Sequence, residues 1–475
     1  MKTERLSTGR QRAKYIVSDI LTGALAFFVF NIARYYLLNE YSRGFIDLWA
    51  YLSSAKLVIE QCIVPVALTV VYWLSGYYNM PFGKSRLQEL ITTFFSVWVN
   101  TAILYLVLLI NDQTGRRTIN YELILTLFGV MFIFTYIVRL IVTENARRHF
   151  RAHQWEFRAL IIGNSPVARS TARRLEKGPS RVGYKILGFV SIPGENSADG
   201  EGRVFNFDNL ESVCRSEGVD QLIIAPEKYD ESKVLDIVFR LFPIGIPIKI
   251  SPDTLSFLTS GIRLKDIYAE PFIDLTAPAL TEASKNIKRV ADVVISLIVL
   301  LLLSPFYALI AACVKATSKG PVFYSQERVG WRQKPFMIYK FRTMRVDAEA
   351  SGPQLSSDND PRITEIGKML RKYRIDELPQ FWNVLKGDMS IVGPRPEREF
   401  FIRQIMKEAP YYTLIYQVRP GITSWGMVKY GYASNVSQMV ERTRYDLIYL
   451  SNMSLYVDMK ILIYTVKTVV TGRGM

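Results

Sequence analysis

The chain has 475 residues, a formal net charge of +16 and a sequence pI near 9.5. That length exceeds what one hydrophobic core serves, so roughly two or three domains are expected. The basic charge requires an anionic partner, but 49% apolar residues and a mean hydropathy of +0.12 are unusual for a soluble nucleic-acid-binding protein and ordinary for a membrane protein. We therefore expect anionic lipid and an anionic substrate as partners, and no nucleic acid.

Cysteine and histidine are scarce and scattered. The cysteines, Cys62, Cys214 and Cys313, lie far apart and form neither a disulfide framework nor a zinc site. The histidines, His149 and His153, stand among arginines in a basic linker. The chemistry of this chain must therefore be carried by carboxylates, cations or a bound metal.

Apolar runs in the first 150 residues predict a bundle of four transmembrane helices, at about 15–38, 57–78, 90–110 and 121–142. Cations before the first run, around Lys84, and at 147–151 place both ends of the bundle in the cytoplasm. Arg116 and Arg117 in the third loop point the other way. We predict the bundle over 1–150.

From residue 157 short apolar strands alternate with amphipathic helices, which is typical of a doubly wound parallel sheet. We therefore predict an α/β Rossmann-like domain over 151–275. After its first strand, Ser165 stands where a dinucleotide fingerprint has its second glycine, and no acidic residue ends the second strand. A nucleotide-binding domain and a structural or regulatory module both stay open.

The nearly uncharged run 290–314 has cations at both ends and is broken by Ser304 and Pro305. About fourteen residues precede the break, which at about 1.5 Å each enter one leaflet without crossing the membrane. We expect a re-entrant helical hairpin over about 286–315 that returns the chain to the cytoplasm, with a kinked crossing span as the alternative. Asp292 near the entrance fits the membrane surface, because a carboxylate deep in lipid is costly.

Adjacent carboxylates, Asp376 and Glu377, dominate the rest of the chain. They lie between Arg371 and Arg374 on one side and, on the other, a Gly-Pro-Arg-Pro turn that presents Arg395. Acids in an arginine-rich frame fit a site for phosphate, in which one carboxylate attacks or holds a metal and the cations neutralise oxygens. For the pair alone, a solvated, salt-bridged helix start is the alternative.

The surrounding pattern predicts a mainly helical domain over 276–475. Short strand-like pieces upstream contribute further cations, Arg328, Lys340 and Arg342. Asp360 and Pro361 are predicted to cap the first of two helices around the carboxylate pair. The amphipathic segment after residue 445 either covers the core or lies on the membrane surface.

From residue 285 onward these motifs closely resemble those of the bacterial monotopic phosphoglycosyl transferases, the polyprenyl-phosphate sugar-phosphate transferases that start exopolysaccharide and O-antigen assembly. The matching pieces are KRVAD with the Ser-Pro break, QERVG, KFRTM, RIDELPQFWNVLKGDMSIVGPRP, RPGIT beginning at Arg419, and YDLIYLSNMSLYVDMKIL. The N-terminal helices and the Rossmann-like domain resemble the long members of the family.

The resemblance implies that a UDP-sugar gives its sugar 1-phosphate to polyprenyl (undecaprenyl) phosphate, with release of UMP, at the bacterial inner membrane. It implies that Asp376 is the nucleophile that forms an aspartyl phosphosugar, that Glu377 completes the dyad, and that Mg²⁺ binds near Asp376. Lys340, Arg371 and Arg395 would hold phosphate oxygens. Further candidates for substrate or phosphate binding are Arg328, Arg342, Arg374, Arg419 and Asp446, which matches an acidic position of the family.

One loop departs from the family pattern. After RPGIT, short members continue with Gly-Trp-Ala-Gln-Val-Asn-Gly-Arg, whereas this chain reads SWGMVKYG over 424–431. The loop arginine is missing, so its substrate contact moves to Lys429 or is lost. Glucose or galactose is the expected sugar, by analogy with the long members.

Two other functions stay open. A membrane-tethered nucleotide-sugar dehydratase or epimerase shares the helical bundle and Rossmann-like domain but requires a glycine loop that this chain lacks. A non-catalytic scaffold of polysaccharide assembly is the other. The sequence leaves the oligomeric state undetermined, and a homodimer through the bundle or the middle domain is one option.

Overall fold

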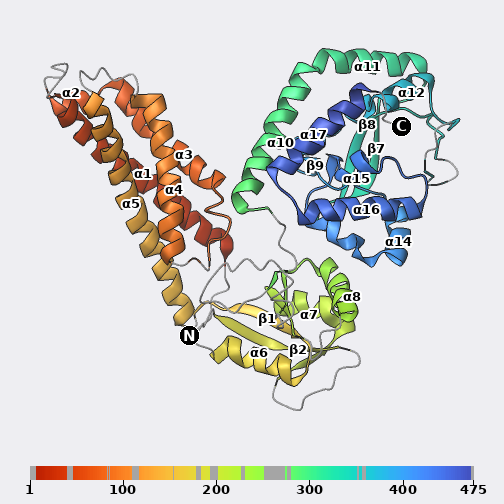
Figure 1. The fold of residues 1–475 in the computed structure, drawn as a ribbon, viewed down its shortest axis with the longest axis horizontal. Coiled ribbons are helices and arrows are strands. Elements are labelled where there is room, and N and C mark those ends of the chain that lie inside the picture. The colour runs from red at the N-terminus through yellow and green to blue at the C-terminus, as the bar shows by residue number, and fades with distance from the viewer. Residues whose placement is uncertain are drawn as a thin grey trace.

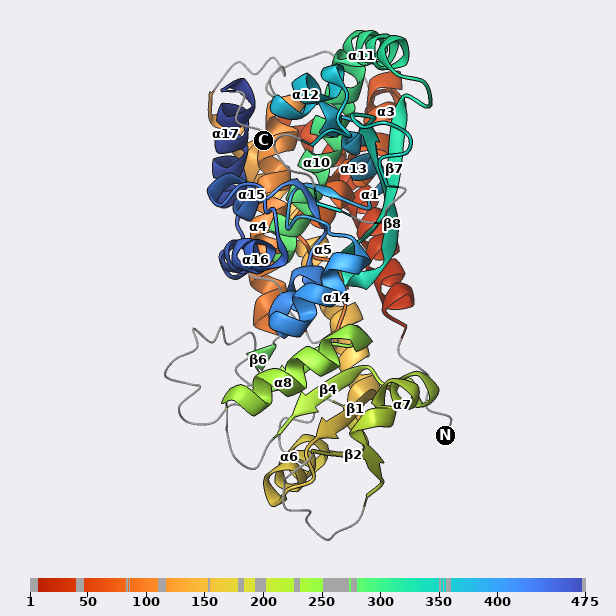
Figure 2. The ribbon, with the colours of Figure 1, turned by 90° about the vertical axis from the view of Figure 1, so that its right-hand side faces the viewer.

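The computed structural model describes residues 7–39, 47–82, 84, 86–109, 117–152, 154–177, 183–192, 202–225, 231–250, 273–274, 280–349, 352, 354–355 and 360–471. These residues form three parts: an N-terminal helical bundle, a middle α/β part and a mainly helical C-terminal part (Figure 1). Figure 1 shows the bundle and the C-terminal part side by side, and Figure 2, in which the C-terminal part lies in front of the bundle, shows the middle part below both.

Among its described residues, the bundle contains four helices that are long and apolar enough to cross a membrane. They are α1 (Thr8–Asn39), α3 (Ala55–Leu74), α4 (Arg86–Leu104), which continues as the π-helical turn η1 (Tyr105–Leu109), and α5 (Arg117–Arg151); the short α2 (Leu48–Leu52) precedes α3. The prediction of four membrane helices is confirmed.

Buried charges tie the helices of the bundle together. Arg139 of α5 donates to Asp19 of α1, with Nη2 and Oδ2 2.7 Å apart, and both side chains are fully buried. The Tyr78 hydroxyl donates to the same carboxylate, and the Tyr77 hydroxyl donates to Glu89 of α4, each at 2.7 Å. Because an unpaired charge in an apolar bundle is costly, these contacts hold the four helices in one register.

The middle part is a six-stranded sheet of order β3-β2-β1-β4-β5-β6, parallel except at β6. Its strands are β1 (Phe157–Ile162), β2 (Tyr184–Ser191), β3 (Val204–Asn206), β4 (Gln221–Ile224), β5 (Ile248–Ile250) and β6 (Ile273–Asp274). Helix α6 (Pro166–Lys177) packs on one face, and α7 (Leu210–Glu217) and α8 (Glu231–Leu241) on the other. The alternating pattern therefore predicts the parallel sheet correctly. Ser165 is buried, and its hydroxyl accepts from Ala168 N (3.2 Å) in the first turn of α6.

The C-terminal part begins with α10 (Glu282–Leu302) and α11 (Ser304–Thr317), which are bent by 62° against each other. The remaining elements are the antiparallel hairpin β7 (Phe323–Val329) and β8 (Pro335–Phe341), α12 (Glu365–Lys372), the 3₁₀ turn η5 (Ile375–Glu377), α13 (Gln380–Lys386), β9 (Ser390–Val392), α14 (Glu399–Glu408), the 3₁₀ segment η6 (Pro410–Gln417), β10 (Gly421–Thr423), α15 (Trp425–Lys429), α16 (Val436–Ser451) and α17 (Leu455–Val470). The predicted break at Ser304 and Pro305 is present, because Pro305 lies in the first turn of α11, where it needs no amide partner.

The predicted cap of α12 is wrong. Thr364 caps this helix, and its Oγ1 accepts from Gly367 N at 3.1 Å. Asp360 instead accepts from Arg362 N (3.0 Å) and forms an ion pair with the Arg362 guanidinium (2.6 Å). Both Asp and Thr suit a cap, but the Asp360 carboxylate is occupied by its local contacts with Arg362, two residues further on, so Thr364 takes the cap position.

The first half of α10 connects the bundle to the C-terminal part. Asn286 Nδ2 donates to the carbonyl of Trp73 at the end of α3 (2.5 Å), and Asn79 Nδ2 donates to Glu282 Oε2 (2.8 Å). On its other side, Arg289 donates to the carbonyl of Val384 at the end of α13 (2.8 Å). Helix α10 therefore sets the position of the bundle relative to the loops around the carboxylate pair.

Asp292 of α10 is buried inside the C-terminal part. Its carboxylate accepts from Ser390 Oγ (2.7 Å) and from Ile391 N (3.2 Å), both on β9. These hydrogen bonds, rather than exposure at the membrane surface, offset the cost of burying the charge. Asp292 thereby anchors the strand that leads directly into the Gly-Pro-Arg-Pro turn.

We expect the Asp292→Ala substitution to destabilise the C-terminal part by about 2 kcal/mol, because Ile391 N–H loses its buried acceptor. Thermal unfolding of the purified protein in detergent should show a melting temperature lowered by several degrees. Glu365→Ala removes an exposed acid of α12 and serves as the control, with an unchanged melting temperature. Equal melting temperatures for the two variants would contradict the anchoring role of Asp292.

Candidate functional site

The carboxylate pair lies in η5, between α12 and α13. Arg374, the residue before this turn, has a positive φ of 54°, a left-handed conformation that is costly for a residue with a side chain. It turns the chain sharply, so that Asp376 and Glu377 point into the protein and are only 7% and 3% exposed. Pro379 then precedes α13 at its N-cap position. The site therefore begins with two buried acids on one tight turn.

Glu377 forms ion pairs with three cations from different segments. Its carboxylate lies 2.9 Å from Lys340 Nζ, 3.2 Å from Arg374 Nη1 and 3.4 Å from Arg395 Nη1. Burial alone would raise the pKa of Glu377, but Lys340, Arg374 and Arg395 together hold it well below its usual range. Glu377 is therefore ionised and immobilised.

The surroundings of the Asp376 carboxylate differ from those of Glu377. Within the described ranges no hydrogen bond or ion pair reaches its carboxylate. Burial raises the pKa of Asp376, the adjacent Glu377 raises it further, and the charges of Lys340 and Arg371 oppose this. Arg371 itself donates from Nε to Thr343 Oγ1 (2.9 Å). The pair thus consists of one fully paired acid and one acid whose oxygens are available to a ligand.

The Gly-Pro-Arg-Pro turn and the RPGIT segment form one structural unit. Strands β9 and β10 are parallel neighbours, and Gly393 N donates to Thr423 O at 3.0 Å. The backbones approach so closely that a Cβ on Gly393 would lie 2.3 Å from Arg419 O, and one on Gly421 would lie 2.1 Å from Gly393 N. Only glycine fits at these two positions, and this contact places Arg395 beside Glu377.

Asp376, Glu377 and the cations around them form the carboxylate cluster. A third buried acid, Glu397, lies at its outer side and was not predicted from the sequence. It accepts from Arg442 Nη2 at 2.6 Å and Arg328 Nη1 at 3.3 Å, and it lies 3.8 Å from Arg395 Nε. Arg395 therefore lies between Glu377 and Glu397. The sequence does contain a signal that these residues belong to the site, because Glu397 directly follows the Gly-Pro-Arg-Pro turn and Arg442 lies one helical turn before Asp446.

Asp446 of α16 supports the site without contacting the pair. Its Oδ1 accepts from Gly426 N at 2.8 Å. Burial raises the pKa of Asp446, and the hydrogen bond from Gly426 and the charge of Arg442 oppose this. The residue orients the loop that follows RPGIT.

Two predicted phosphate-binding residues do not join the cluster. Arg342 donates from Nη1 to Lys319 O (2.9 Å) and from Nη2 to Ser318 O (2.8 Å), at the end of α11. Arg419 donates from Nε to Gly387 O (2.9 Å) and lies over the Trp331 ring. A phosphate contact for either residue stays a prediction, and the observed contacts are with the protein itself.

Among the described residues, no group of three or more His, Cys, Asp or Glu side chains could hold a metal ion. The available oxygens of Asp376 still suit Mg²⁺, because this ion commonly binds through one or two carboxylates together with substrate phosphates and water. A magnesium site in this protein would therefore be completed by the substrate.

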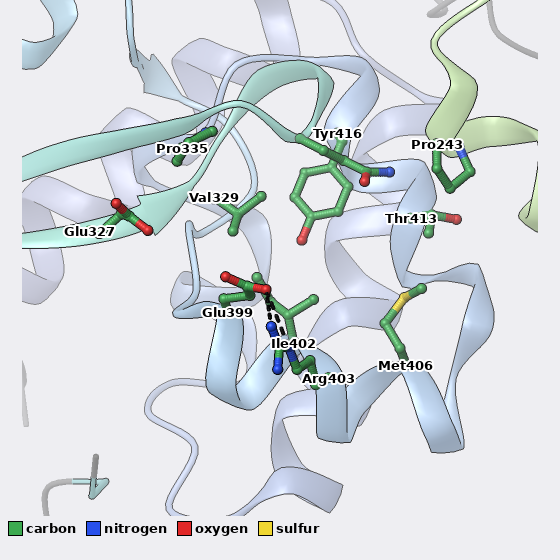
Figure 3. A pocket seen from close by; sticks show the side chains of 11 residues that line it. Pro243, Glu327, Val329, Pro335, Glu399, Ile402, Arg403, Met406, Thr413 and Tyr416 are labelled. Atoms are coloured by element: carbon green, nitrogen blue, oxygen red, sulfur yellow. Dashed lines mark hydrogen bonds and ion pairs between the residues drawn. The ribbon is translucent and has the colours of Figure 1, made fainter. Parts of the chain in front are cut away.

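A separate cavity of about 540 Å³ lies between the C-terminal and middle parts (Figure 3). The β7–β8 hairpin, α14, η6 and Pro243 of the middle part line it. The Tyr416 hydroxyl and the ion pair of Arg403 with Glu399 (2.5 Å) face this cavity in Figure 3. None of the predicted site residues lines it, so we place the site at the carboxylate cluster.

Comparison with known proteins matches residues 283–472 to the bacterial sugar transferase family and residues 73–252 to a family described as a CoA-binding domain. The chain is 45% identical over 188 residues to the UDP-N-acetylgalactosamine-undecaprenyl-phosphate N-acetylgalactosaminephosphotransferase of Aeromonas hydrophila, covering 40% of this chain and 44% of that relative. The match thus spans less than half of that protein.

Two relatives named UDP-glucose:undecaprenyl-phosphate glucose-1-phosphate transferase match over longer stretches. The Escherichia coli protein is 32% identical over 320 residues, covering 66% of this chain and 68% of the relative. The Xanthomonas campestris protein is 28% identical over 420 residues, covering 85% of each chain. The C-terminal match, the second match across the later bundle helices and the middle part, and these long relatives agree with one another: the chain belongs to the bacterial sugar transferase family, in its long form, and is a sugar phosphotransferase.

Proposed function

We propose that this protein transfers a sugar 1-phosphate from a UDP-sugar to polyprenyl phosphate and releases UMP, in two steps through an aspartyl phosphosugar. The observation that carries the proposal is the unequal pairing of the two acids. Three cations hold Glu377, whereas no described residue binds the Asp376 carboxylate. The available acid is suited to attack, and the paired acid keeps the cations in place.

In the first step an Asp376 oxygen attacks the β-phosphorus of the donor. The new aspartyl–phosphorus bond forms as the bond from that phosphorus to the bridging oxygen breaks, and UMP leaves with this oxygen. In the second step a phosphate oxygen of the polyprenyl phosphate attacks the same phosphorus, which releases the Asp376 carboxylate and forms a polyprenyl diphosphate sugar. One phosphate pocket thus serves a soluble donor and a lipid acceptor in turn.

The cations around the pair suit both steps. Lys340, Arg371 and Arg395 offset the charge that accumulates when an anionic nucleophile meets an anionic diphosphate. A Mg²⁺ ion, when bound with Asp376 as one ligand, would withdraw charge from the diphosphate oxygens. Burial raises the pKa of Asp376, and the charges of Lys340 and Arg371 oppose that shift, so the same cations also favour the ionised carboxylate that attacks.

For the donor we propose a UDP-hexose, with glucose or galactose as the first candidates. The relatives named above use glucose and N-acetylgalactosamine according to their names, so a panel of UDP-sugars must include the acetamido sugar. The product is the first lipid-linked intermediate of a surface polysaccharide.

We further propose that the chain lies in the bacterial inner membrane, with the Rossmann-like middle part and the C-terminal part in the cytoplasm. The bent pair α10 and α11 would then enter one leaflet as a re-entrant hairpin. Exposed apolar side chains along both helices, Leu297, Ile298, Leu301, Leu302 and Leu309, support contact with lipid. This arrangement would hold the carboxylate pair at the depth of the lipid phosphate.

Replacing the proposed nucleophile should abolish the reaction. We expect Asp376→Asn to lower UMP release by about a thousandfold or more, because an amide cannot form the covalent intermediate. Mass spectrometry of wild-type protein mixed with UDP-sugar and no acceptor should detect a phosphohexose adduct on Asp376. Asp388→Asn, in the same segment but outside the cluster, is the control and should keep both the UMP release and the phosphohexose adduct. Normal UMP release by Asp376→Asn would refute the assignment.

The pH dependence tests the role of Lys340. Asp376 must be ionised to attack, so kcat/KM should fall as the pH drops through the raised pKa of this carboxyl. Lys340 lowers that pKa, and its loss in Lys340→Met must raise it further, so the acidic limb of the kcat/KM profile should move to higher pH. The maximal rate should also fall by about tenfold or more, because a phosphate-binding charge is lost. Lys368→Met removes an exposed cation and should leave the profile unchanged; a profile that does not move in Lys340→Met would contradict the proposal.

Cysteine labelling separates a re-entrant hairpin from a crossing span. In a chain whose native cysteines are replaced by serine, a cysteine at the exposed Lys319 should react with a membrane-impermeant maleimide only after the cells are permeabilised. A cysteine at Arg215 in the middle part should behave identically, and one at Asn111 in the third loop should react from outside. Labelling of position 319 from outside, with position 215 protected, would indicate a crossing span.

A further inference from the structure

Tyr432 lies directly against the cations of the site. The centre of its ring is 5.1 Å from Arg374 Cζ and 5.6 Å from Arg395 Cζ, the two guanidinium groups that pair with Glu377. The arginine side chains are 10% and 16% exposed, whereas Tyr432 is 42% exposed. The ring is therefore the outer layer over these cations and leaves a large part of its surface open to a ligand.

The backbone on both sides holds this ring in place. Gly431 has a φ of +93°, which other residues rarely adopt, so the chain turns sharply just before Tyr432. Ala433 is buried in the hydrophobic core, and Ser434 N donates to Gln438 Oε1 at 2.7 Å. The Tyr432 ring is thus held in one position beside the cluster, and a residue must be held in this way to discriminate between ligands.

Lys429, the predicted substitute for the missing loop arginine, lies against aromatic rings. Its Nζ lies over the rings of Trp425 and Tyr464, 5.5 Å and 5.6 Å from their centres. No ion pair links it to Glu377 among the described contacts of that acid. Tyr432, the residue directly after this loop, places an aromatic ring beside Arg374 and Arg395.

We propose that Tyr432 is a donor-binding residue that packs against the hexose of the UDP-sugar. The inference rests on the proposed function, because it requires the β-phosphate to lie beside Asp376 and the cations. The sugar is bonded to that phosphate and must lie within a few ångströms of it, next to the exposed ring. An aromatic ring offers apolar contact to the C–H face of a pyranose and no charge, so it suits a neutral hexose or acetamidohexose rather than an acidic sugar.

The test compares a UDP-sugar, which contains the hexose, with UDP, which does not. Steady-state UMP release yields kcat and KM for the UDP-sugar, and inhibition by UDP, which has the diphosphate but no hexose, yields its inhibition constant. In Tyr432→Ala we expect KM to rise about tenfold, kcat to stay within about threefold, and the UDP inhibition constant to stay within about twofold of wild type. Tyr432→Phe keeps the ring and should restore the wild-type KM.

Tyr430→Ala is the matched control, because this tyrosine lies two residues away and packs near Tyr445 instead of the cations. It should leave all three constants unchanged. An unchanged KM in Tyr432→Ala would overturn the inference. A parallel rise of KM and of the UDP inhibition constant would also overturn it, because the ring would then act through the guanidinium groups. Wild-type protein that releases no UMP from any UDP-sugar would instead refute the proposed function itself.

Discussion

The site depends on one electrostatic constraint, the burial of two adjacent carboxylates on a single turn. Two unpaired ionised carboxylates cannot share such a position, so the protein places three cations around Glu377. Lys340 comes from β8, Arg374 from the strained turn and Arg395 from the Gly-Pro-Arg-Pro segment. With Glu377 fully paired, the Asp376 oxygens are left to a ligand, and this asymmetry separates the two roles.

The rest of the C-terminal part maintains those three contacts. The close packing of Gly393 with Gly421 and the buried Glu397 position Arg395, and Asp292 anchors the strand that leads to it. Asp292 belongs to α10, whose first turns also bind the end of α3 in the bundle. Helix α10 therefore connects the membrane part to the site, and a shift of α10 would reach Arg395 through β9.

Much of the fold and of the candidate site was predictable from the sequence. The four apolar spans, the parallel sheet, the helix break at Ser304 and Pro305, and the acids in a basic frame all follow from local composition and periodicity. The prediction of the α12 cap was wrong, because Asp360 has a stronger partner in Arg362. Arg342 and Arg419 carry the right charge, but their guanidinium groups bind backbone carbonyls away from the pair.

The sequence by itself determined the number of membrane helices, the α/β pattern of the middle part and the two acids in a frame of Arg371, Arg374 and Arg395, and the resemblance to the family added Lys340. These features depend on residue type and on spacing within short segments. Only the tertiary structure decided which acid is paired and which is available, that Glu397 and Arg442 complete the cluster, and that Tyr432 covers it. Those contacts join segments up to 69 residues apart in the chain, as between Arg328 and Glu397, and their geometry depends on how β8, the Gly-Pro-Arg-Pro turn and α16 pack together.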